Sequence, residues 1–102
     1  MSHRIAYAPE AEAQLVSLYH YISQQSGSEI AHRFTEAIMA HCDKLSDYPE
    51  RGRPRDDLRS GLRTMAFRRR VTIAYAVNEV EVRILGVFYG GQDLEAALHG
   101  GG

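Results

Sequence analysis

The first half of the chain has the hydrophobic pattern of one short strand followed by two helices. Ile5 and Tyr7 alternate with other residues up to Pro9, which predicts a strand. Pro9 suits the first turn of a helix, because the N–H that proline lacks has no partner there. The apolar positions that then recur at helical spacing are Ala11, Leu15, Leu18, Tyr19 and Ile22. This helix is expected to end at the SQQSGS segment, residues 23–28.

A second helix is expected to begin at Ser28, whose hydroxyl can cap the helix N-terminus. It should end near Tyr48 and Pro49. Its apolar stripe consists of Ile30 or Ala31, Phe34, Ile38, His41 or Cys42, and Leu45. Because the break between the two helices is short, they are expected to lie antiparallel as a hairpin.

Beyond Pro49 the pattern becomes strand-like. Residues 49–61 contain two prolines and two glycines and predict a loop. Strands are then expected at residues 62–67, 71–77 and 80–89, the last two joined by a turn at Asn78 and Glu79, where Asn tolerates a positive φ. The run from Ile84 to Phe88 is apolar on both faces, so it is expected to be the central, doubly covered strand.

This order of elements predicts the α+β class: an N-terminal strand, an antiparallel helical hairpin, and a three-stranded antiparallel meander that completes the sheet. A chain of 102 residues is expected to form one domain, here residues 1–98. A short helix is expected at Asp93–Leu98, and residues 99–102 should be a flexible, glycine-rich tail.

Positive charge is concentrated in one part of the chain. Eight of the twelve basic residues lie between Arg51 and Arg70, all of them arginine, and only Asp56 and Asp57 oppose them there. Residues 1–50 have a net charge of −4, from three basic and seven acidic residues, whereas residues 51–102 have a net charge of +3, from nine and six. Arginine favours planar, bidentate contacts with carboxylate or phosphate, so this segment is the expected binding region.

Several classes of function are disfavoured. No apolar run is long enough to span a membrane and no secretory leader precedes Ile5, so the chain is expected to be cytoplasmic. The single cysteine, Cys42, cannot form an internal disulfide and is interpreted as a small buried apolar residue. The histidines lack the spacing of metal ligands, and no phosphate-binding loop or nucleophilic triad is present. We therefore predict no metal, no cofactor and no membrane partner.

Five segments together resemble the RelE/ParE superfamily of toxins from type II toxin–antitoxin systems. They are PEAEAQLVSLYHYI at residues 9–22, PERGRPR at 49–55, GLR at 61–63, RVTIAY at 70–75 and VRILGVFYGGQDLEAAL at 82–98. They span nearly the whole chain in the expected order. The long helical hairpin and the intact loop and G-L-R pattern favour the ParE-like branch.

The resemblance implies a toxin held silent by a cognate, ParD-like antitoxin in a hetero-oligomer, with DNA contacted only through the antitoxin. Released ParE-like toxins are associated with inhibition of DNA gyrase without catalysis, whereas RelE-like toxins cleave messenger RNA in the ribosome. RNA cleavage needs a group that activates the ribose 2′-OH, and none is evident. The family's closing motif often carries His and Arg where this chain has Tyr89 and Gln92. Gyrase inhibition by binding is therefore favoured. The alternatives are a ribosome-dependent mRNA endoribonuclease and a small nucleic-acid-binding module.

No catalytic residue is assigned. The residues expected to bind the antitoxin or the target are Arg53, Arg55, Arg63, Arg70, Tyr75 and Tyr89. Two of them have a purely structural alternative: Arg63 could pair with Asp56 or Asp57, and Tyr75 could belong to the core. Arg68 and Arg69 are expected to be solvated hairpin residues.

Overall fold

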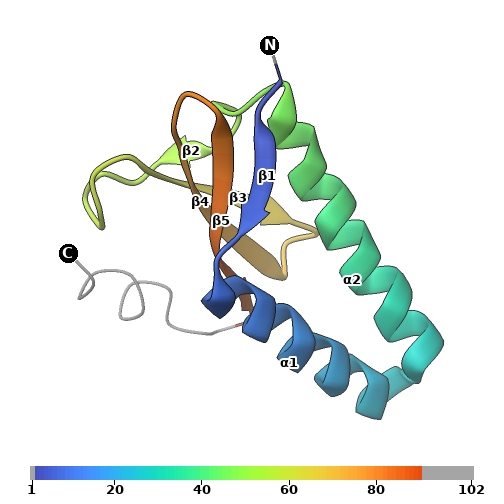
Figure 1. The fold of residues 1–102 in the computed structure, drawn as a ribbon. Helices are drawn as coiled ribbons and strands as arrows, with labels where there is room; N and C mark the ends of the chain where they lie inside the picture. The colour runs from blue at the N-terminus through green and yellow to red at the C-terminus, as the bar shows by residue number, and fades with distance from the viewer. Residues whose placement is uncertain (1, 91–102) are drawn as a thin grey trace.

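The computed structural model describes residues 2–90 and confirms the predicted α+β class. The two helices form a V that covers one face of a five-stranded sheet (Figure 1). The elements are β1 (Arg4–Tyr7), α1 (Pro9–Ser26), α2 (Ser28–Asp43), the 3-10 helix η1 (Lys44–Ser46), β2 (Arg53–Pro54), β3 (Leu62–Phe67), β4 (Val71–Val77) and β5 (Glu81–Tyr89). The strand order is β1-β5-β4-β3-β2, with β1 parallel to β5 and the other pairs antiparallel.

The helical hairpin has a shorter connection than predicted. Pro9 opens α1 as expected, but the helix continues to Ser26, because Ser and Gln cost little within a helix. The break is Gly27 alone, which adopts a φ of 95° that glycine tolerates without strain. Ser28 is the first residue of α2 and makes no capping hydrogen bond. The predicted six-residue break and the Ser28 cap are therefore wrong.

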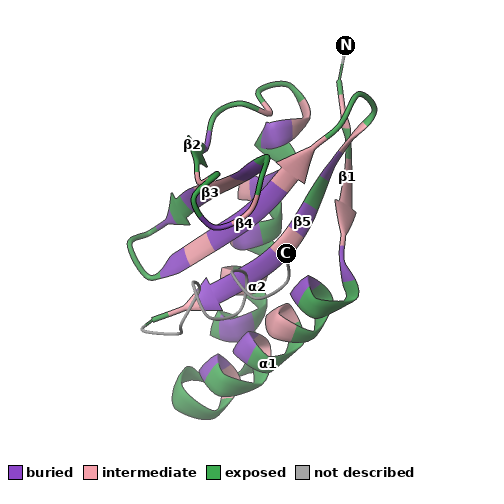
Figure 2. Ribbon diagram, turned by 90° about the vertical axis from the view of Figure 1, so that its left-hand side faces the viewer, coloured by how far each residue is buried: buried purple, intermediate pink, exposed green. Residues whose placement is uncertain are grey.

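The main core lies between the helices and one face of the sheet, and Figure 2 shows its buried residues along α1, α2, β4 and β5. Cys42 is fully buried in this core, as predicted, and burial raises the pKa of its thiol to about 11. The thiol is therefore protonated near neutral pH. None of the helices in the described part of the chain is long and apolar enough to cross a membrane.

The run from Ile84 to Phe88 is not in the central strand, because β4 occupies the middle of the sheet and β5 lies between β1 and β4. The run is nevertheless covered on both faces. Ile84 and Val87 pack into the main core, while Phe88 joins a smaller cluster on the opposite face. A register shift opposite Ala74 and Tyr75 interrupts the alternation of β5, which explains its continuous apolar sequence.

The turn at Asn78 differs from the prediction, whereas Arg68 and Arg69 are exposed hairpin residues as predicted. The Asn78 carboxamide accepts the N–H groups of Val80 and Glu81 at 2.9 and 2.8 Å, and the turn is centred one residue later than predicted. Asn78 has no positive φ. Among the described non-glycine residues, only Arg68 and Arg69 do, at 50° and 63°. Each non-glycine residue in this left-handed conformation costs about 1–2 kcal/mol of conformational free energy.

The C-terminal predictions lie outside the described residues. These are the Asp93–Leu98 helix, the end of the domain at residue 98 and the flexible tail at 99–102.

Candidate functional site

The eight arginines do not form one patch, as their sequence positions suggested, but two groups at opposite ends of β3. The loop end comprises Arg51, Arg53, Arg55, Arg59 and Arg63, and the turn end comprises Arg68, Arg69 and Arg70. The members of the two groups nearest to each other along the strand, Arg63 and Arg68, are five positions apart, about 17 Å at 3.4 Å per residue. No single small ligand can therefore contact both groups.

The loop end is anchored by Tyr75. This side chain is 0% exposed, and its hydroxyl accepts the Gly52 N–H at 2.7 Å and donates to the Pro49 carbonyl at 2.9 Å. Burial raises the pKa of Tyr75, so the hydroxyl stays protonated and keeps its donor role. The sequence alternatives for Tyr75 were core and contact, and the structure places it in the core with no surface to offer a partner.

Arg63 holds the same loop from the neighbouring strand. Its Nη1 donates to the carbonyl oxygens of Glu50 at 3.1 Å and Gly52 at 2.7 Å. It does not pair with either acid suggested by the sequence. Asp57 binds Arg55 through two hydrogen bonds of 3.0 Å, and Asp56 accepts the Gly61 N–H at 2.8 Å. The acids thus shape the loop instead of neutralising Arg63.

Gly52 is required by this close packing. A Cβ there would lie 2.8 Å from the Thr64 carbonyl oxygen and 2.5 Å from the Tyr75 hydroxyl. The glycine lets the loop approach β3, where Arg53 and Pro54 form the edge strand β2 that the sequence did not predict. A charge and a proline on an edge strand oppose further strand addition.

The anchored loop presents exposed side chains beside a shallow hollow. Arg51 and Arg53 are exposed, and Tyr48 is 69% exposed. The hollow has a volume of about 600 Å³ and is lined by Asp47, Tyr48, Pro49, Glu50 and Arg51. Tyr and Arg are the residue types that contribute most at protein interfaces. Sequence analysis missed Tyr48 because its place at a helix end gave no sign of exposure.

The turn end contains the other two candidates. Arg70 is exposed, and its carbonyl accepts the Gly90 N–H at 2.8 Å. Tyr89 is half-buried, with its ring centroid 5.8 Å from that of Tyr21 and 6.3 Å from that of Phe34. Tyr21 is 50% exposed, so the two tyrosines form an amphipathic surface.

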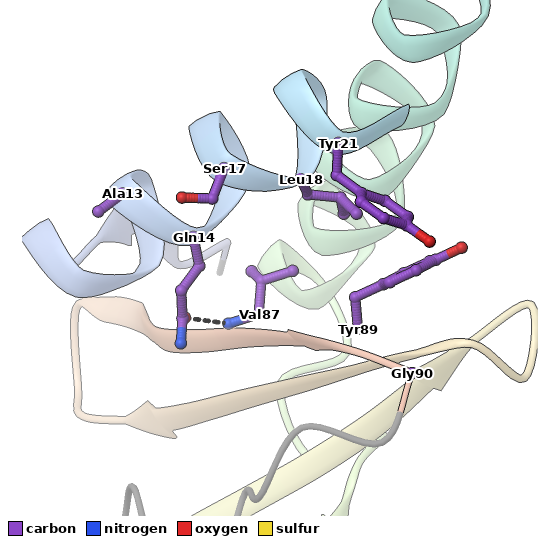
Figure 3. A pocket seen from close by; sticks show the side chains of 8 residues that line it. All are labelled: Ala13, Gln14, Ser17, Leu18, Tyr21, Val87, Tyr89 and Gly90. Atoms are coloured by element: carbon purple, nitrogen blue, oxygen red, sulfur yellow. Dashed lines mark hydrogen bonds between the residues drawn. The ribbon is translucent and has the colours of Figure 1, made fainter. Parts of the chain in front are cut away.

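A groove of about 540 Å³ runs from this tyrosine pair along α1 and β5 (Figure 3). It is lined by Ala13, Gln14, Ser17, Leu18, Tyr21, Val87, Tyr89 and Gly90. The groove exists because β1 pairs with β5 only as far as Ile84. Beyond that point the Gln14 side chain accepts the Val87 N–H at 2.7 Å. The small residues Ala13 and Ser17, one helical turn apart, were the only sequence signal for this space.

Within residues 2–90, no three histidine, cysteine or acidic side chains gather as a metal site. The described polar groups of the loop end, Tyr75 and Arg63, are engaged with backbone atoms.

The chain matches known proteins over most of its length. Residues 5–94 match the family model described as the ParE toxin of type II toxin-antitoxin system, parDE. Toxin ParE3 from Caulobacter vibrioides is 28% identical over 95 residues, which cover 93% of this chain and 94% of that protein. A solved structure, described as the chromosomal ParDE TA system from P. aeruginosa, matches with a TM-score of 0.76 and 21% identity, covering 87% of this chain and 97% of that one.

Proposed function

Because this chain belongs to the ParE toxin family of type II toxin–antitoxin systems, we propose that a ParD-like antitoxin holds it inactive and that the released toxin inhibits DNA gyrase by binding. Both events are placed in the cytoplasm. The toxin domain is taken to extend over residues 1–98. The proposal assigns the two ends of the sheet to different partners.

The antitoxin is assigned to the groove at the turn end. Ala13, Leu18 and Val87 give this groove an apolar lining, which suits the apolar anchors of a segment that folds on binding. Tyr89 stands at one end of the groove, and Arg70 is tied to its rim through Gly90. An antitoxin segment with apolar anchors fits this surface.

The target is assigned to the loop end, and the anchored loop is the observation that carries this assignment. Tyr75 and Arg63 fix the backbone at Pro49, Glu50 and Gly52. The neighbouring side chains of Arg51 and Arg53 are thereby presented at a lower entropic cost on binding. Tyr75 is buried and protonated and Arg63 is cationic, so neither can act as the base that RNA cleavage requires.

The test is a supercoiling assay with purified gyrase, run beside a translating-ribosome assay read by primer extension. Inhibition of supercoiling at near-stoichiometric ratios, with intact messenger RNA, is expected. Arg53→Glu should weaken inhibition, while Arg83→Glu, which changes an exposed charge on β5, should not. Cleavage within translated codons together with unaffected supercoiling would replace this proposal with an endoribonuclease.

A further inference from the structure

The turn between β3 and β4 combines consecutive arginines with a strained backbone. Phe67 and Val71 are the last paired residues, and the turn consists of Arg68, Arg69 and Arg70. Arg68 and Arg69 both have positive φ values, 50° and 63°. Turns of this kind favour Asn-Gly, which adopts that backbone readily. Arginine disfavours the positive φ that this turn requires at Arg68 and Arg69. The two arginines therefore do not stabilise the hairpin, and its stability does not explain why they are there.

Arg68 is held in place by aromatic rings. Its guanidinium carbon lies 4.8 Å from the ring centroid of Phe67 and 5.9 Å from that of Phe34. The two rings themselves pack edge to face at 5.8 Å. A cation over an aromatic face is attracted by the ring and loses conformational freedom before any ligand arrives. Arg68 is nevertheless exposed, so its N–H groups remain accessible to a ligand.

Within residues 2–90, no carboxylate forms an ion pair with this turn. The ion pairs among residues 2–90 are Arg4–Glu81, Arg55–Asp57 and Arg83–Glu81, and none includes a turn arginine. Arg68, Arg69 and Arg70 are all exposed. Three adjacent, exposed guanidinium groups suit a ligand that carries several closely spaced anions.

We propose that the Arg68–Arg70 turn binds the phosphate backbone of nucleic acid directly. The sequence had suggested that DNA is contacted only through the antitoxin. An acidic protein segment is the weaker fit, because such a partner needs apolar anchors and the exposed residues of the turn are all arginine. The apolar groove lies between α1 and β5, whereas Arg68 packs on Phe34 of α2 and Phe67 of β3. The two surfaces are neighbours with separate linings.

The test measures fluorescence anisotropy of labelled duplex DNA of about 20 base pairs with the full-length chain, at about 50 and 200 mM salt. Arg69→Gly should raise the melting temperature, because glycine relieves the strained φ, and should also lower DNA affinity. Arg69→Gly/Arg70→Gln should weaken binding about tenfold at low salt and reduce the log–log salt slope by about 2, since each phosphate contact contributes about 0.9. A single-stranded oligonucleotide of the same length shows whether the phosphates must belong to a duplex.

Arg51→Gln/Arg53→Gln is the matched control, because it removes the same charge from the loop end. An equal loss of affinity in this control would overturn the proposal and leave only an effect of overall charge. Tighter binding to polyglutamate than to DNA would overturn it in favour of an acidic protein partner. A more stable Arg69→Gly variant with unchanged DNA affinity would also overturn it. None of these measurements depends on gyrase or on the antitoxin.

Discussion

Arg63 and Tyr75 are direct cross-strand partners on β3 and β4, and both side chains end on the same loop. The Tyr75 hydroxyl accepts a hydrogen bond from the Gly52 N–H and donates one to the Pro49 carbonyl. Arg63 donates hydrogen bonds to the carbonyls of Glu50 and Gly52. Three sequence motifs, at 49–55, 61–63 and 70–75, are thus parts of one anchor. The residues expected to contact a partner include two that position the loop.

Tyr75→Phe should release the loop while leaving the core filled. The change deletes the hydroxyl that satisfies Gly52 N–H and Pro49 C=O, and leaving buried polar groups unpaired costs about 1–3 kcal/mol in unfolding free energy. Trypsin should then cut faster after Arg51 and Arg55. Tyr48→Phe is the matched control, since Tyr48 is 69% exposed. Equal stability and equal cleavage rates in the two variants would rule out the anchor.

Gly52→Ala should destabilise the protein through a steric clash. The added Cβ would lie 2.8 Å from a backbone oxygen of β3, so the loop or the strand must move. Overpacking of this kind costs about 1–3 kcal/mol, measurable by urea denaturation. Ser60→Ala, at an exposed position of the same loop, should be nearly neutral. A Gly52→Ala variant as stable as the wild type would show that the loop is not held against β3.

The sequence was sufficient for the two helices and for strands β1, β3, β4 and β5, apart from their exact ends, because their signals are local. Pro9 marks the start of α1, and the alternation at Val71, Ile73 and Tyr75 defines β4. The loop anchor was not predictable in the same way, since the Tyr75 hydroxyl reaches partners 23 and 26 positions earlier in the chain. The groove depends on where β1 stops beside β5, which hydrophobic periodicity does not encode.

The arginine cluster shows the opposite failure, in which a strong linear signal was misleading. Arg63 and Arg68 are five residues apart in the sequence, yet an extended strand carries them to different ends of the sheet. A cluster of charged residues in the sequence forms one charged surface patch only when the segment that carries them is not extended. The hairpin between β3 and β4 separates what the sequence groups together.

His41 should make stability depend on pH. Burial, Lys44 and Arg51 lower its pKa below the usual 6.5, and its ring packs on Phe67 at 5.2 Å. The unfolded chain takes up a proton near pH 6.5 while the folded chain does so only at lower pH, so folding stability falls as the pH drops through this window. His41→Gln should make the melting temperature depend less on pH between about pH 7 and 5. A melting temperature of His41→Gln that depends on pH as steeply as that of the wild type would contradict the prediction.

Filling the groove should separate toxicity from neutralisation. Ala13 and Ser17 are exposed on α1 and line the groove, so Ala13→Leu/Ser17→Leu occupies the space without disturbing the core. Loss of the antitoxin's apolar anchors should weaken the complex by about 10- to 100-fold, or about 1.4–2.8 kcal/mol, by calorimetry. Cells should then stop growing even when the antitoxin is co-expressed. Val16→Leu, at an exposed α1 position outside the groove lining, is the control for added apolar surface.

Arg53→Glu should have the reverse effect, because Arg53 is exposed on the edge strand β2, whereas the groove lies between α1 and β5. Antitoxin affinity should be retained, while growth arrest by the toxin expressed alone should be relieved. Charge reversal at a desolvated contact costs several kcal/mol, whereas at a wet rim it costs under about 1 kcal/mol, so the size of the effect reports how deeply the loop is buried by the target. If one variant abolished both antitoxin binding and toxicity, the two partners would share a surface, and the assignment of separate ends would be wrong.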